Sequence, residues 1–97
     1  MPKAYMIFTE RVHDAELMKE YSKAATAAFG GGSTAKVLAV TREPIALEGE
    51  WSATQTVLLE FESEEAARAW YGSDGYQAAA AIRQRAADTD VVILPGL

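Results

Sequence analysis

The chain has 97 residues, 49% of them apolar, so it is long enough and apolar enough to fold as one compact domain. Its formal charge is −5 and its nine lysines and arginines are scattered, which argues against binding nucleic acid or an anionic membrane surface. Because there is no cysteine, disulfides, thiolate metal sites and a cysteine nucleophile are excluded. We expect a single cytoplasmic domain over residues 1–97, with no secretion signal and no membrane-spanning segment.

Four segments have the composition of β-strands. They cover residues 3–10, 35–41, 54–61 and about 90–94. In the first segment, Met6 and Phe8 alternate with Tyr5 and Ile7, so apolar side chains point to both faces of the strand. This pattern predicts a strand that is covered on both sides.

The first helix is predicted over about residues 15–29, with Asp14 as its N-cap and a stripe of apolar side chains at helical spacing. The glycines at 30–32 are expected to end it. A phosphate-binding loop is the lesser alternative for them, because such loops precede a helix and these glycines follow one.

A second helical region is predicted to begin after Ser63, which can cap it, and to run to about Ala87. The pair Gly72–Ser73 should bend or break this region, and Ser73 can cap the continuation.

The order β-α-β-β-α-β predicts an α+β fold of the ferredoxin-like type. In that fold a four-stranded antiparallel sheet carries two helices on one face and leaves the other face open. The predicted strands place apolar groups on both faces, and an open apolar face of this size should not remain in water. We therefore expect a homodimer formed through the open sheet face.

Arg83 is the sharpest candidate for a functional residue, because it falls on the apolar side of the second helical region, in line with Tyr76. Burying an arginine without a partner would cost several kcal/mol. One interpretation is a structural ion pair with Glu48 or Glu60. The other is that the guanidinium binds the carboxylate or enolate of a small molecule.

Glu48 and Glu60 are the acids that we expect to supply proton transfer. If Glu60 faces an interior, burial would raise its pKa and make it a base. Trp51 in the loop after Glu48 fits a pocket wall or the rim of an interface equally well. Trp70, in contrast, falls on the helical apolar stripe and is expected in the core.

His13 is the only histidine, so no histidine-based metal or haem site is predicted and we expect no cofactor. A lone histidine beside a helix cap is expected to be a solvated loop residue. A catalytic role for His13 is the lesser alternative.

A spaced set of residues along nearly the whole chain carries a family resemblance. These residues are Asp14, Tyr21, Gly30, Gly31, Glu48, Gly49, Trp51, Glu60, Phe61, Ala67, Ala69, Trp70, Tyr71, Ser73, Tyr76, Gln77 and Arg83. With them the chain resembles the domain-of-unknown-function family 1330, within the dimeric α+β barrel superfamily. The resemblance implies a ferredoxin-like protomer and a homodimer whose sheets form a barrel, and it implies no particular reaction. The wider superfamily includes cofactor-free monooxygenases and isomerases, so the fold does not settle the function.

We therefore expect a small homodimer that binds or transforms a small organic acid or enolisable molecule without a cofactor. The expected catalytic residues are Arg83, Glu48 and Glu60. The expected ligand-binding residues are Trp51, Tyr71 and Tyr76. The alternative is a non-catalytic ligand-binding or interaction domain, in which the same residues only stabilise the dimer.

Overall fold

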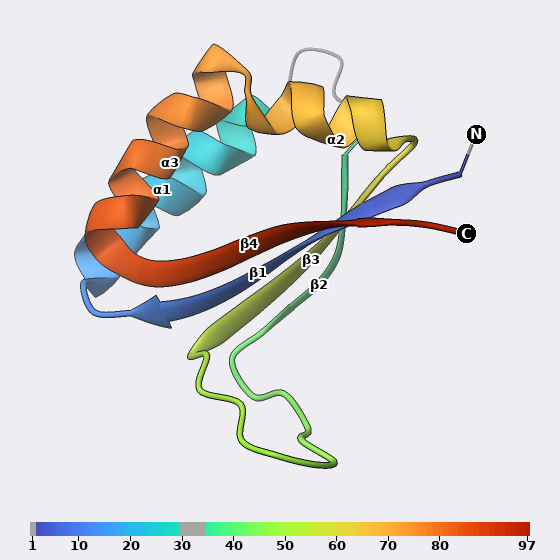
Figure 1. Ribbon diagram of the computed structural model, residues 1–97. Helices are drawn as coiled ribbons and strands as arrows, with labels where there is room; N and C mark the ends of the chain where they lie inside the picture. The colour runs from blue at the N-terminus through green and yellow to red at the C-terminus, as the bar shows by residue number, and fades with distance from the viewer. Residues whose placement is uncertain (1, 30–34) are drawn as a thin grey trace.

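The computed structural model describes residues 2–29 and 35–97, which contain four strands and three helices (Figure 1). The strands are β1 (Ala4–Val12), β2 (Lys36–Thr41), β3 (Gln55–Phe61) and β4 (Ala87–Pro95). The helices are α1 (Ala15–Ala28), α2 (Glu64–Tyr71) and α3 (Asp74–Ala86). The predicted glycine stop at 30–32 lies outside the described residues.

The strands form one sheet in the order β2-β3-β1-β4, and each pair of neighbours is antiparallel. The helices cover one face, and the loop between β2 and β3 projects away from them (Figure 1). This is the α+β ferredoxin-like fold that the element order predicts.

The second helical region is two helices, α2 and α3. The side chain of Ser73 accepts a hydrogen bond from the backbone N–H of Tyr76 at 3.2 Å, so it caps α3 as expected. Asp14 and Ser63 cap α1 and α2 in the same way, at 3.1 Å and 3.0 Å. The predicted caps are therefore confirmed.

Two strands are longer than predicted. β1 continues to Val12, and β4 begins at Ala87, directly after α3. The backbone of Ala87 is extended, with φ −155°, and Ala87 pairs with Val12 across the sheet. The prediction ended β1 early and started β4 late because neither junction contains the glycine or proline that usually marks one.

The core lies between the sheet and the helices. Along β1 the inward side chains of Ala4, Met6 and Phe8 are buried, and the outward ones are only half-buried. Ala79 and Ala80 of α3 are also buried, and their small side chains let α3 pack closely. None of the helices in residues 2–29 and 35–97 is long and apolar enough to cross a membrane.

Candidate functional site

A cluster of polar side chains is buried between the sheet and the helices. We call it the buried polar cluster, and its members are Glu10, Tyr21, Gln55, Tyr76 and Arg83. Glu10 is 0% exposed and Arg83 is 3% exposed, so both charged groups lie in the interior. Buried charges are rare in proteins unless they are paired or functional.

The sheet positions the acid of this cluster. Glu10 is the next inward-facing residue of β1 after Phe8, and the other residues on this face of the strand are apolar. Its directly opposite neighbours are Gln55 on β3 and Thr89 on β4. Gln55 Nε2 donates a hydrogen bond to Glu10 Oε1 at 3.0 Å and so fixes one carboxylate oxygen.

Helix α3 positions the cation. Tyr76 and Arg83 are about two helical turns apart, so they lie on the same side of α3. Arg83 Nη1 donates to the Tyr76 hydroxyl at 3.0 Å, and that hydroxyl shares a 2.9 Å hydrogen bond with the hydroxyl of Tyr21. The guanidinium also lies 5.6 Å from the centre of the Phe8 ring, within cation–π range.

Three buried polar atoms at this place have no hydrogen-bond partner among the described residues. They are Glu10 Oε2, Arg83 Nε and Thr89 Oγ1. Leaving a buried polar atom without a partner costs about 1–3 kcal/mol, and more when the group is charged. Three such atoms on β1, β4 and α3 make this place the candidate site for a polar ligand.

The interior changes the acidity of these groups. Burial raises the pKa of Glu10 above its ordinary value, and the hydrogen bond from Gln55 and the charge of Arg83 offset this only in part. Burial also raises the pKa of Tyr21 and that of Tyr76, so both hydroxyls stay protonated at neutral pH.

Two adjoining hollows run along the edge strand β4, and together we call them the β4 groove. One has a volume of about 480 Å³ and is lined in part by Tyr71, Arg83 and Thr89. The other, of about 440 Å³, is lined by Met6, Arg68 and Tyr71 together with Val91 and Ile93 among others. The groove thus has a polar end at Arg83 and a more apolar end along β4.

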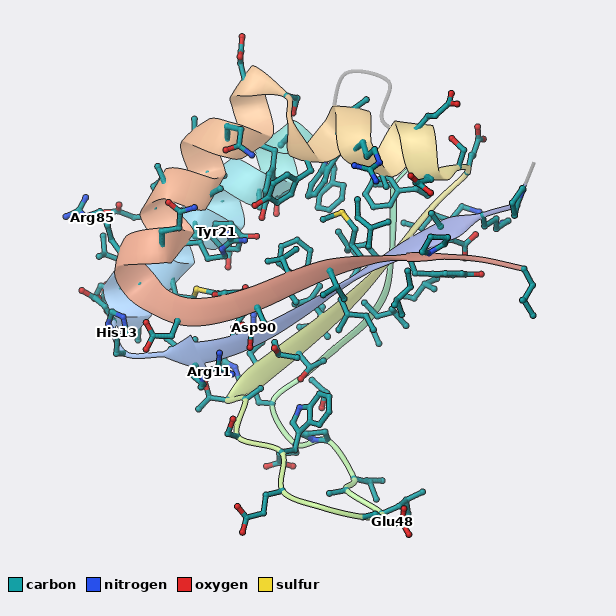
Figure 2. The ribbon with its side chains drawn as sticks, in the orientation of Figure 1. Arg11, His13, Tyr21, Glu48, Arg85 and Asp90 are labelled. Atoms are coloured by element: carbon teal, nitrogen blue, oxygen red, sulfur yellow. The ribbon has the colours of Figure 1, made fainter. Side chains whose placement is uncertain are left out.

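Three of the six residues predicted for the site lie together. The Tyr76 hydroxyl accepts a hydrogen bond from Arg83. The ring centre of Tyr71 is 5.4 Å from that of Tyr76. Tyr71 lines both hollows, and Arg83 lines the first of them. At the rim, Arg11 and Asp90 form a 3.1 Å ion pair, and both are labelled in Figure 2.

The other three predicted site residues, Glu48, Trp51 and Glu60, lie elsewhere in this chain. Glu48 is exposed in the β2–β3 loop, far from Tyr21 in Figure 2, so it does not form the ion pair with Arg83 that one interpretation required. Trp51, in the same loop, is 52% exposed, and its indole N–H donates to Thr56 Oγ1 at 2.9 Å. His13 is exposed next to the cap of α1.

Glu60 lies on the opposite face of the sheet from Arg83. It faces the open side of the sheet and forms an ion pair with Lys3, so it does not reach Arg83 on the helical side. The hydrogen bond from Lys3 lowers the pKa of Glu60, which is opposite to the raised pKa that a buried position would have produced.

Sequence reasoning missed Glu10, Gln55 and Thr89. Glu10 could have been found from the two-residue alternation of β1, which places it on the same face as Met6 and Phe8. A buried carboxylate needs a nearby cation to balance its charge, and Arg83 is the cation that the helical pattern predicts in the interior.

The raised pKa of Glu10 gives a pH-dependent prediction. A folded pKa above the unfolded value means that the folded state holds the proton more tightly, so stability is lost as pH rises through the interval between the two values. Glu10→Gln, which mimics the protonated acid, should match the parent at about pH 4 and be more stable at about pH 8. Urea midpoints across this range test it, and a difference between the two proteins that does not change with pH would contradict it.

Comparison with known proteins agrees with this fold. The family model described as domain of unknown function (DUF1330) matches residues 3–97. No curated protein matches.

Among solved structures, the chain is similar to a protein of unknown function from Rhodopseudomonas palustris, with a TM-score of 0.78 and 20% identity over 99% of this chain and 83% of that one. It is also similar to a dimeric ferredoxin-like protein of unknown function from Thermobifida fusca, with a TM-score of 0.68 and 17% identity over 97% and 91% of the two chains. A third similar structure is SnoaB, a cofactor-independent oxygenase from Streptomyces nogalater, with a TM-score of 0.65 and 10% identity over 97% and 92%.

At these identities the solved structures establish a shared fold and nothing about activity. The family match covers almost the whole chain and includes every residue of the buried polar cluster and of the β4 groove. The chain therefore belongs to the DUF1330 family, whose function is unknown.

Proposed function

We propose that the protein binds a small organic acid or enolisable molecule in the β4 groove and acts on it without a cofactor. The observation that carries this proposal is Arg83, which is 3% exposed, lines the groove, and has an Nε–H without a partner among the described residues. A carboxylate or enolate oxygen of the ligand would satisfy that N–H with a charge-assisted hydrogen bond.

The surroundings of Arg83 favour this ligand class. Tyr76 holds one guanidinium nitrogen, and the Phe8 ring packs against the guanidinium, so the group is fixed before a ligand arrives. Tyr71 lies between the polar and apolar ends of the groove and would contact the ligand at both. The best ligand therefore has an acidic head and an apolar tail.

Cofactor-free chemistry is supported by analogy of fold. SnoaB, which has a similar fold, is a cofactor-independent oxygenase. The alternative is a non-catalytic role, in which Arg83 stabilises the fold through Tyr76 and the aromatic rings.

Replacing Arg83 with lysine is expected to weaken the binding of α-ketoisocaproate, an oxo acid with an apolar tail, by about tenfold or more. Lysine keeps the charge but loses the planar fork, and a hydrogen bond to a charged group contributes about 1.5–3 kcal/mol. Calorimetric titration measures the affinity, and circular dichroism checks that the variant is folded.

The matched control is Arg85→Lys. Arg85 is exposed on the same helix and points away from the sheet (Figure 2). Its replacement should leave the affinity unchanged. Equal affinities for both variants, or no binding of the oxo acid by the parent protein, would contradict the proposed site.

We also propose that two copies pair through the open face of the sheet. Ile7 lies opposite both Leu58 and Val92, so these three apolar residues form a row across the face, and Val92 is 49% exposed. In the β2–β3 loop beside this face, Ile45 and Leu47 are 89% and 91% exposed. Apolar surface of this extent marks an interface.

The similar structure from Thermobifida fusca is described as dimeric. Trp51, Glu48 and Glu60 would then belong to the dimer contact.

Replacing Val92 with glutamate is expected to convert the dimer to a monomer. The variant would place two like charges at the centre of a desolvated interface, which costs several kcal/mol. Sedimentation at micromolar concentration measures the mass, and Ala81→Glu, on the exposed side of α3, serves as control. A parent protein that sediments as a monomer would rule out the pairing.

A further inference from the structure

The three unpartnered atoms described above differ in what they can do. Arg83 Nε can only donate, a carboxylate oxygen can only accept, and the Thr89 hydroxyl can do both. Thr89 and Glu10 are directly opposite on β4 and β1, and both face the helices. Thr89, whose hydroxyl can both accept and donate, therefore lines the groove and lies directly opposite the buried carboxylate of Glu10.

Only two of these three residues line the groove. Arg83 and Thr89 do, whereas Glu10 is 0% exposed and lines neither hollow. Directly opposite side chains in an antiparallel pair have their Cβ atoms about 4.5–5.5 Å apart, so a threonine hydroxyl and a glutamate carboxylate at these positions are within reach of each other. Glu10 is then reached through Thr89.

Gln55 keeps Glu10 available for this role. It holds Oε1 from the β3 side of the sheet and leaves Oε2 without a partner among the described residues. The other ionisable groups near the carboxylate are Arg83 and Tyr21. The Tyr21 hydroxyl is engaged with Tyr76, so it does not compete for Oε2.

We propose that Glu10, acting through the Thr89 hydroxyl, removes a proton from the carbon next to the carbonyl of an oxo acid bound in the β4 groove. The C–H bond breaks and its proton passes to Thr89 Oγ1, while the hydroxyl proton of Thr89 passes to Glu10 Oε2. The C–H electron pair forms the carbon–carbon double bond, and the carbonyl pair moves to oxygen. The resulting enolate oxygen accepts from Arg83, and return of the proton completes the cycle without an oxidant.

Two further observations agree with this assignment. A carboxylate in an apolar interior is a stronger base than an exposed one, and burial raises the pKa of Glu10. The acids expected from the sequence, Glu48 and Glu60, do not line the groove. The inference rests on the proposed binding of an oxo acid at Arg83.

The test is exchange of the protons next to the carbonyl of α-ketoisocaproate for deuterium in D₂O, followed by NMR. The parent protein should accelerate exchange about 100-fold or more over buffer, as expected for a positioned base. Glu10→Gln and Thr89→Val should both reduce exchange to the buffer rate while calorimetry shows unchanged affinity. Thr89→Ser, which restores the hydroxyl, should recover exchange.

The controls separate this inference from the proposed binding. Glu20→Gln, which changes an exposed acid of α1, should exchange like the parent protein. Trimethylpyruvate, which has no such proton, should bind without reaction. Binding of α-ketoisocaproate without accelerated exchange overturns the inference and leaves the binding site standing, whereas absence of binding overturns the proposed function. Exchange that survives Glu10→Gln, or is lost in Glu60→Gln or Glu48→Gln instead, also overturns the inference.

Discussion

Replacing Arg83 with methionine is expected to lower the free energy of unfolding by about 3 kcal/mol at neutral pH, because it leaves the buried carboxylate of Glu10 without a counter-charge. Methionine keeps much of the volume that packs against Phe8 and Tyr21, so the loss reports mainly on charge and on the hydrogen bond to Tyr76. Chemical denaturation measures it. An Arg85→Met variant, on the exposed face of α3, should cost less than about 0.5 kcal/mol.

The double variant distinguishes charge coupling from lost packing. If the charge of Arg83 stabilises the carboxylate, Arg83→Met should cost about 1 kcal/mol less in a Glu10→Gln background. The same reduction should appear in the Glu10 protein in acid, where the carboxylate takes up a proton. Strictly additive effects of the two substitutions would mean that the two groups do not interact.

These stability effects bear on function, because replacing a charged residue that stabilises the fold and replacing one that serves a site are expected to change stability in opposite directions. If the charge of Glu10 stabilised the fold, its folded pKa would be lowered, and Glu10→Gln would destabilise the protein at neutral pH. Its raised pKa instead makes the ionised carboxylate a net cost at neutral pH, so the neutral variant should be the more stable one. A residue that is costly to stability and lies beside an open groove is typical of an active site.

Local sequence signals predicted the architecture, and long-range contacts decided the site. The caps at Asp14, Ser63 and Ser73 and the alternation in β1 act within a few residues, so they can be found in the sequence. The inward position of Glu10 is readable from that alternation, but its partner Gln55 lies 45 residues away in the chain and is set by the sheet register that joins them. No local pattern carries that register.

The separation of Glu48 and Glu60 from Arg83 has a related cause. Both are acids near aromatic residues in the sequence. The strand alternation that places Glu60 opposite Tyr5 also turns it to the open face, away from Arg83. For Glu48, the β2–β3 loop carries it away from the helices, and loop conformation cannot be derived from residue type alone. Tyr76 and Arg83 came together because they lie on one side of α3, whose periodicity is readable in the sequence, and Tyr71 ends the helix just before it.

Replacing Trp70 with alanine is expected to cost about 3–5 kcal/mol of unfolding free energy and to lower Tm by more than about 10 °C. Trp70 is 8% exposed, and its ring centre lies 4.1 Å from that of Tyr76, 5.2 Å from that of Phe29 and 5.4 Å from that of Phe61. Because α2 has only eight residues, its attachment to the core depends largely on this side chain. Thermal melts followed by circular dichroism measure the effect.

The substitution also tests how the core supports the site, since Trp70 packs on the same Tyr76 that holds Arg83. Trp70→Phe keeps a ring against Tyr76 and removes an indole N–H that has no partner among the described residues, so it should cost less than half as much as alanine. Trp51→Ala, by contrast, removes a ring that is 52% exposed and should barely change the melting of the protomer. A Trp70→Ala protein with the same Tm as the parent would show that other contacts hold α2 on the core. In that case the affinity for the oxo acid should also be unchanged.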